Sequence, residues 1–138
     1  MPSRMDFGIS HTYNDRDNGI AIPVKLISGK CDVHLTAILD TGSTFCLFER
    51  GFGEWLGLDI EAGNRQGFRT AAGRFVAFGH ELTLSTLGLD MDSTVYFFAD
   101  AAIRKNVLGR RGWLDRVRLA VVDYEQILYL APYDSPAQ

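Results

Sequence analysis

The stretch Ala37-Ile38-Leu39-Asp40-Thr41-Gly42-Ser43-Thr44-Phe45 places a carboxylate, three hydroxyls and a glycine at the end of an apolar run. A buried carboxylate must be hydrogen-bonded, paired or protonated, so an aspartate directly after Ala-Ile-Leu indicates a specialised environment. The alternative is an ordinary turn, because Asp-Thr-Gly is common turn chemistry. A surface turn is normally flanked by polar residues, whereas this one lies between two apolar, strand-like runs, and we therefore favour a functional site.

Alternating apolar residues precede this stretch and predict a β-hairpin that ends at Asp40. Residues 20–26 and 33–39 each alternate apolar and polar positions, which is the period of a half-buried strand. Gly29-Lys30 lies between them and suits a two-residue hairpin loop with glycine first. The second strand of the hairpin therefore delivers Asp40 to its end.

The residues after the stretch predict a strand, a helix and a second hairpin. The strand covers residues 44–48, and Phe52, Trp55 and Leu56 in the following segment have helical spacing. Glycines in that segment resemble a dinucleotide-binding loop only superficially, because their spacing is off by one residue and no strand-helix-strand unit follows. Residues 68–78 predict a hairpin whose small tip residues can approach a ligand closely.

Later segments complete a chain made mostly of strands. Residues 81–87 and 94–98 predict two strands separated by a loop at 88–92, and residues 117–121 and 127–129 predict a closing hairpin. Few helical patterns interrupt them, so we expect a mostly β domain.

Length, charge and hydropathy limit the function classes. The chain has 138 residues, which suits one domain with one core. We expect a flexible N-terminal arm at 1–18, a folded domain at 19–131 and a polar tail at 132–138. The net charge of −3 argues against a nucleic-acid partner. No apolar run approaches the roughly 18 residues that cross a bilayer, and the N-terminal segment lacks the apolar core of a secretion signal, so we expect no membrane partner and a cytoplasmic location.

The two cysteines, Cys31 and Cys46, lie in apolar, strand-like segments. We expect both to be buried free thiols. A disulfide between them is the alternative.

Two motifs resemble those of the aspartic proteases. The run Ile38-Leu39-Asp40-Thr41-Gly42-Ser43-Thr44 resembles their active-site signature, in which two apolar residues precede Asp-Thr-Gly. Asn106-Val107-Leu108-Gly109-Arg110 resembles the apolar-apolar-Gly-Arg segment that follows it in chain order. Because this chain has a single Asp-Thr-Gly, the resemblance is to the single-domain, retropepsin-like branch, in which two chains form one active site. It covers residues 20–131 and implies a closed, barrel-like β fold with one or two short helices and a flap hairpin.

The resemblance implies an aspartic endopeptidase that acts as a homodimer on a peptide or protein substrate, with no metal and no cofactor. The catalytic residues are then Asp40, Thr41 and Gly42, with Asp40 of each copy sharing one proton and activating a water. Thr41 is expected to donate its hydroxyl across the dimer axis. Ser43 is expected either to hydrogen-bond the outer oxygen of Asp40 or to cap a turn. The residues expected to contact substrate are Ser43, Ala72, Gly73, Phe75 and Val107.

Departures from the family pattern leave a rival interpretation open. Retroviral enzymes usually have an aspartate where Thr44 stands and Asp or Asn where Arg111 stands, so Arg110 lacks its expected partner unless Asp115 replaces it. The rival is a non-catalytic dimerisation or peptide-binding module with the same fold.

Other hydrolase classes have weaker support in the sequence. No Gly-x-Ser-x-Gly elbow occurs, and a cysteine protease would need one of the two cysteines that are expected to be buried. Asp32 and His34 form a tight carboxylate and imidazole pair on one strand face, which is more often a solvent face than a metal site.

Overall fold

The computed structural model describes residues 2–134 and is made mostly of strands. Within that part of the chain, no helix is long and apolar enough to span a membrane. The longer strands are β2 (Ala21–Ser28), β3 (Cys31–Leu39), β5 (Asn64–Thr70), β6 (Gly73–Thr86), β7 (Leu89–Phe98), β9 (Val117–Val122) and β10 (Ile127–Pro132), and the shorter ones are β1 (Ile9–Thr12), β4 (Leu47–Phe48) and β8 (Val107–Leu108). The helices are α1 (Arg50–Trp55) and the 3-10 turns η1 (Ile60–Ala62), η2 (Leu114–Arg116) and η3 (Asp123–Glu125).

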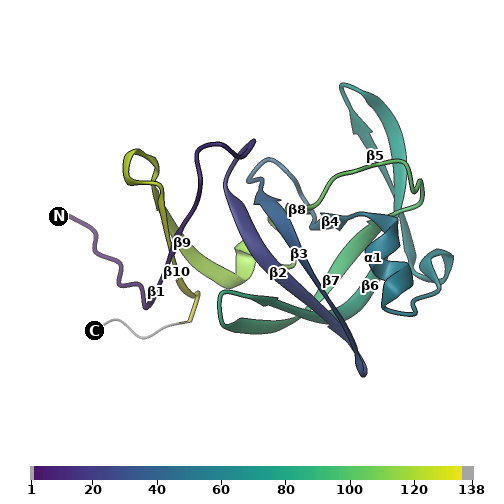
Figure 1. Ribbon diagram of the computed structural model, residues 1–138, viewed down its shortest axis with the longest axis horizontal. Coiled ribbons are helices and arrows are strands. Elements are labelled where there is room, and N and C mark those ends of the chain that lie inside the picture. The colour runs from purple at the N-terminus through teal and green to yellow at the C-terminus, as the bar shows by residue number, and fades with distance from the viewer. Residues whose placement is uncertain (1, 135–138) are drawn as a thin grey trace.

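The strands form two sheets (Figure 1). The larger sheet has the order β2-β3-β8-β4-β7-β6-β5, and a further pairing of β2 with β6 joins the strands from β2 to β6 in a ring. Strand β5 pairs with β6 alone, and the β5–β6 hairpin projects from the body. The smaller sheet has the order β1-β10-β9. The expected mostly β fold with short helices is therefore confirmed.

The core fills with side chains from the inward positions of these strands. Trp113, Phe48 and Phe97 are fully buried, and alternating residues of β2 lie beside them in the same cluster. The indole nitrogen of Trp113 donates to the hydroxyl of Thr86 at 2.9 Å, which satisfies both buried polar groups.

Three stretches differ from the sequence expectation. The strand expected at 44–48 is shortened to β4, because Thr44 lies in a bend and Phe45 forms only an isolated bridge with Arg111. Residues 9–12, assigned to a flexible arm, form β1 and pair with β10, with Ile9 opposite Leu130. The pattern of four residues cannot indicate that they pair with a strand as distant in sequence as β10. The prediction of a loop at 88–92 is also wrong, because β7 already begins at Leu89. The preceding strand is joined to it by a tight turn in which Leu87 and Gly88 both have positive φ.

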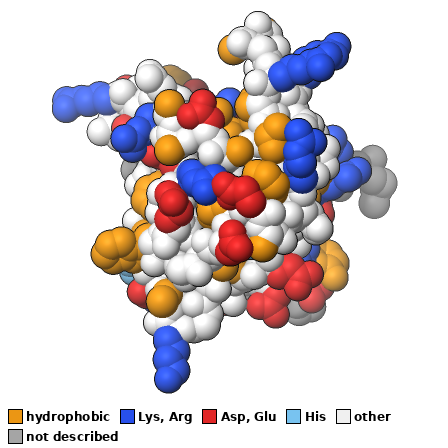
Figure 2. Space-filling view, turned by 90° about the vertical axis from the view of Figure 1, so that its right-hand side faces the viewer, with side chains coloured by type: hydrophobic (Ala, Val, Ile, Leu, Met, Phe, Trp, Pro, Cys, Tyr) orange, Lys and Arg blue, Asp and Glu red, His pale blue; other side chains and the backbone are white. Residues whose placement is uncertain are grey.

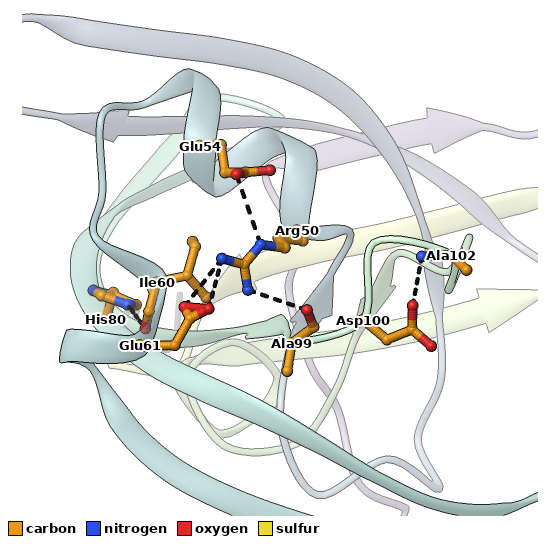
Figure 3. Close-up of polar contacts among 8 residues, drawn as sticks. All are labelled: Arg50, Glu54, Ile60, Glu61, His80, Ala99, Asp100 and Ala102. Atoms are coloured by element: carbon orange, nitrogen blue, oxygen red, sulfur yellow. Dashed lines mark hydrogen bonds and ion pairs between the residues drawn. The ribbon is translucent and has the colours of Figure 1, made fainter.

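Arg50 connects helix α1 to the base of the β5–β6 hairpin (Figure 3). Its guanidinium donates to the carbonyl of Ala99 at 3.1 Å and contacts Glu61 at 2.6 Å, and Glu61 belongs to η1, which leads directly into β5. His80 of β6 is hydrogen-bonded to the carbonyl of Ile60 at 2.9 Å. The projecting hairpin is thus held at its base by α1 and η1, the latter through His80 of β6.

The segment after Asp40 crosses the segment that follows β8 at very close range. The amide of Arg110 donates to the carbonyl of Ser43 at 2.9 Å, and the amide of Arg111 donates to that of Thr44 at 2.8 Å. A Cβ built on Gly109 would lie 2.2 Å from the carbonyl oxygen of Phe45. Only glycine fits here, because the obstructing atoms belong to backbone.

The two cysteines have different environments. Cys46 is fully buried at the crossing, where its sulfur accepts the amide hydrogen of Gly109 at 3.4 Å, and burial raises the pKa of this thiol to about 12. Cys31 is exposed, so its expected burial is wrong, because it lies at the start of β3 beside the hairpin loop. Both are free thiols.

Gly109→Ala should destabilise the fold by about 1–3 kcal/mol, the usual cost of overpacking a rigid site. The added methyl group must displace the Ser43 and Phe45 carbonyls and break the crossing. Urea unfolding measures the change, and Gly67→Ala is the control, since a Cβ there meets nothing within 4 Å. Equal stability of both variants would contradict a tight crossing.

Cys31 should react with a disulfide reagent at pH 8 in the native protein, whereas Cys46 should react only after unfolding. The Cys46 thiol has a pKa of about 12 and therefore stays protonated at pH 8. Its sulfur is also fully buried, so the reagent cannot reach it in the native protein. Absorbance of the released thiol should give one equivalent in buffer and two in guanidinium. The variant Cys31→Ser should give none in buffer, and rapid reaction of that variant would refute the burial of Cys46.

Candidate functional site

Asp40 lies where β3 ends, directly beside β8. Leu39 pairs with Leu108 in parallel register, and the amide of Asp40 then donates to the carbonyl of Leu108 at 3.0 Å. The side chain of Asp40 is half-buried. The apolar strand therefore carries the carboxylate to the edge of the core, with its backbone fixed by β8.

The turn after Asp40 binds one oxygen of its carboxylate. The amide of Gly42 donates to Oδ1 at 3.0 Å, and the amide of Ser43 donates to the backbone carbonyl of Asp40 at 3.1 Å. A Cβ on Gly42 would stand 3.3 Å from Oδ1, so a larger residue would crowd this contact. The other oxygen, Oδ2, has no hydrogen-bond partner among residues 2–134. The turn thus orients Asp40 and leaves one oxygen available.

The two hydroxyl residues of the turn have different roles. Thr41 is exposed, and its hydroxyl makes no hydrogen bond with any other described residue. The hydroxyl of Ser43 donates to the carbonyl of Phe45 at 2.7 Å, so it stabilises the turn and does not bind the outer oxygen of Asp40. Of the two expectations for Ser43, the turn-capping one agrees with this contact.

The arginines after Gly109 form no ion pair with the described residues, and for Arg110 this agrees with the departure from the family pattern. Arg110 is exposed and makes no ion pair with the described residues, and Asp115 instead accepts the amide hydrogen of Gly112 at 3.1 Å. The guanidinium of Arg111 lies 5.9 Å from the ring centroid of Phe45, in a cation–π contact. Asp115 therefore caps the turn before η2 and makes no ion pair with Arg110, so the alternative in which it replaces the missing partner is not found.

The β5–β6 hairpin has an exposed tip at Ala71 and Ala72. The hydroxyl of Thr70 accepts the amide hydrogen of Ala72 at 3.2 Å and donates to the carbonyl of Gly73 at 3.3 Å. Gly73 has a φ of 127°, which strongly favours glycine. The hairpin expected from the sequence is present, with Ala72 and Gly73 at its tip.

Aromatic rings connect this hairpin to the turn that carries Asp40. Phe68 and Phe75 stack at 5.0 Å across the hairpin, and Phe68 meets the edge of Phe45 at 5.7 Å. Phe45 in turn lies 4.6 Å from Tyr96. Val107 belongs to the same cluster but is only 3% exposed, so it supports the rings from behind. We call Phe45, Phe68, Phe75 and Tyr96 the aromatic wall.

The structure brings some predicted site residues together and leaves others apart. Asp40, Thr41, Gly42 and Ser43 form one turn, and Phe75 and Val107 share the cluster that contains Phe45, which lies five residues after Asp40. Ala72 and Gly73 make no hydrogen bond with that turn. Sequence reasoning missed Phe45 and Tyr96, because an aromatic residue in a strand normally indicates core.

Asp40 lies outside the pocket at the aromatic wall. This pocket has a volume of about 420 Å³, and its lining includes Phe45, Tyr96 and Arg111 but not Asp40. Among the described residues, no group of three or more His, Cys, Asp or Glu side chains could hold a metal ion. The available chemistry is that of one oriented carboxylate at a surface that one chain leaves open.

Comparison with known proteins identifies the fold. No family model matches the sequence, and no curated protein sequence matches it. Among solved structures, a retropepsin-like aspartic protease from Rickettsia conorii matches with a TM-score of 0.67 at 17% identity, covering 88% of this chain and 96% of that one. The EIAV protease, solved in complex with the inhibitor HBY-793, matches with a TM-score of 0.55 at 20% identity, covering 72% of this chain and 88% of that one. This chain therefore has the fold of the retropepsin-like aspartic proteases.

Proposed function

We propose that this protein is an aspartic endopeptidase in which two copies of the chain each supply one Asp40. The observation that carries the proposal is the turn at Asp40, held by the backbone of residues 108–111 within a retropepsin-like fold. One carboxylate cannot act as both general base and general acid toward a peptide bond in the same step. A second copy related by a two-fold axis supplies the missing carboxylate.

The proposed reaction uses a water held between the two Asp40 side chains. Two carboxylates at such short range share one proton, as the paired aspartates of the aspartic proteases do, because like charges repel in a low-dielectric site. The ionised member takes a proton from the water, and the protonated member donates a hydrogen bond to the peptide carbonyl. Water attack then gives a tetrahedral intermediate without an acyl-enzyme, and activity depends on pH in two coupled steps.

Thr41 is the residue that we propose to hold the two turns in register. Its hydroxyl is exposed and makes no hydrogen bond within residues 2–134, although it lies next to a carboxylate whose backbone is fixed on both sides. A hydroxyl in this position can donate to a backbone carbonyl of the second copy. The dimer would then satisfy a group that the single chain leaves to solvent.

The substrate that we propose is an extended peptide lying between the Asp40 pair and the β5–β6 hairpins. The aromatic wall offers half-buried apolar surface on Phe45 and Phe75, and the small tip residues Ala72 and Gly73 allow close approach to a peptide backbone. Val107 contributes by holding the wall in place. No metal or other cofactor takes part in this mechanism.

We also propose a cytoplasmic location. Cys31 is an exposed free thiol, and such thiols persist best in a reducing compartment.

Asp40→Asn should reduce cleavage of a denatured protein pool by at least about a hundredfold, because general acid and base catalysis contributes that much or more. Product peptides are counted by mass spectrometry, with and without a statine-type inhibitor. The matched control is Asp59→Asn, since the Asp59 side chain makes no capping hydrogen bond. Undiminished cleavage by Asp40→Asn would refute the mechanism, and no cleavage by the unaltered protein as a dimer would favour the non-catalytic peptide-binding module.

Thr41→Ala should shift the monomer–dimer equilibrium toward monomer by about thirtyfold, because the substitution removes both hydroxyls of the proposed pair and each contributes about 1 kcal/mol. Sedimentation at micromolar concentration measures the equilibrium. Thr41→Ser keeps the hydroxyl and should dimerise as the unaltered protein does. A strictly monomeric unaltered protein would end the proposal of a shared site.

A further inference from the structure

The β5–β6 hairpin carries exposed arginines on one face. Arg69 is paired directly with Arg74 across the two strands, and Arg65 lies four residues before Arg69 on the same face, since strand side chains alternate. None of the three forms an ion pair with another residue of the 2–134 range. Figure 2 shows Lys and Arg side chains standing out from the hairpin that projects at its top.

This concentration of positive charge is not a consequence of composition. The whole chain has a net charge of −3. Like charges placed directly opposite each other across two strands are destabilising, yet Arg69 and Arg74 occupy such a pair. An anionic group between them would turn this repulsion into attraction.

The same strand directs backbone groups to its free edge, where the side-chain amide of Gln66 donates a long hydrogen bond of 3.4 Å to the carbonyl of Gly67. The amide of Ala99 donates to the carbonyl of Val76 at 2.9 Å, so the backbone groups of Val76 point away from β5. Gly67 is the partner of Val76 in β5 and must therefore point its own amide and carbonyl away from β6, as antiparallel pairs alternate. Residues two positions away along the strand share this direction, which places the backbone groups of Arg65 and Arg69 on the free edge too.

Gly67 leaves space between the two arginines. A Cβ built on it would meet nothing within 4 Å. A shallow pocket of about 390 Å³ runs along the hairpin, and its walls are Gly67, Val76, the two aromatic residues Phe68 and Phe75, and all three arginines. A second strand could lie along this edge if the exposed Gln66 side chain gave up its long contact with the Gly67 carbonyl.

We propose that this surface, the arginine edge (Arg65, Gly67, Arg69 and Arg74), binds an extended peptide whose acidic residues stand four positions apart. The peptide adds to β5 as a further strand and pairs with the outward amides and carbonyls. Its acidic residues lie opposite Arg65 and Arg69, which are about 13 Å apart at roughly 3.3 Å per strand residue. The residue between them lies over Gly67.

The chemistry of the edge favours a peptide over a nucleic acid. Nucleic-acid strands are held by aromatic stacking together with positive charge. Phe68 and Phe75 also line this pocket, but their rings are stacked on each other and packed against Phe45, Tyr96 and Phe98. Backbone amides and carbonyls in strand register match another peptide backbone. The proposal does not depend on Asp40 being catalytic, since none of the groups involved belongs to that turn.

The test is a binding measurement on the full chain in the Asp40→Asn background, where no turnover consumes the probe. A fluorescent nine-residue peptide carries Glu at positions 3 and 7, and a second peptide of equal composition carries Glu at positions 3 and 6, which face opposite sides of a strand. Fluorescence anisotropy should show at least about tenfold tighter binding of the first peptide. In a ¹⁵N spectrum its addition should shift the amide signals of Arg65, Gly67 and Arg69.

Two kinds of variant distinguish the contribution of the arginine charges to peptide binding from the contribution of backbone pairing. Arg65→Gln/Arg69→Gln should weaken binding about tenfold or more, whereas Arg16→Gln/Lys105→Gln, which removes two exposed charges elsewhere, should leave it unchanged. Gly67→Pro removes one outward amide while keeping every arginine, and it should also abolish binding. Circular dichroism and the melting temperature establish that each variant is folded.

The outcomes that overturn the proposal are distinct. Equal affinity for the two peptides would reduce the edge to a non-specific positive surface. Tighter binding of double-stranded DNA or of anionic vesicles than of the first peptide would assign the surface to a different partner. Binding by none of the probes would mean that the arginines only keep a free strand edge from pairing. Each result leaves the cleavage assay of Asp40 unaffected.

Discussion

The close crossing of two backbone segments at Gly109 is the constraint on which the rest of this structure depends. The turn that carries Asp40 has no helix or sheet of its own, and its position is fixed by amides and carbonyls of residues 108–111. Those hydrogen bonds require the two backbones to touch, and the space next to Phe45 admits no side chain. The buried sulfur of Cys46 fills the remaining corner and accepts the amide hydrogen of Gly109. A rigid turn is what places a half-buried carboxylate at a defined point on the surface.

The sequence predicted the elements of this fold where the signal is local. The alternation in β2 and β3, the glycine-first loop between them and the hairpin tip at Gly73 are properties of a few adjacent residues, and all were found as expected. The pairing of β1 with β10 was missed, since its two strands are more than a hundred residues apart. The exposure of Cys31 was missed for a related reason. Apolar composition indicates a strand, but which end of the strand leaves the core depends on the strands beside it.

The candidate site was predictable as a motif but not as a surface. Asp40, Thr41 and Gly42 are recognisable from their order, whereas the aromatic wall depends on contacts between β5, β6, β7 and the turn. The hydroxyl of Ser43 was assigned two alternative partners, and only the folded structure distinguishes them. The outer oxygen of Asp40 and the hydroxyl of Thr41 have no hydrogen-bond partner among the described residues, and both lie on one turn. That is the arrangement expected if a second copy completes the site.

The β5–β6 hairpin explains how one small element can serve two surfaces. Its Phe68 and Phe75 side chains pack against the body and fix its position relative to Asp40, while the alternate residues Arg65 and Arg69 face away from that packing. Because neighbouring side chains in a strand point in opposite directions, the aromatic face and the arginine edge can change independently of each other. A free edge strand also carries a risk of unwanted pairing, and charge is the usual protection. Here the charges share a face and flank a glycine, which leaves room for one strand of complementary charge while repelling others.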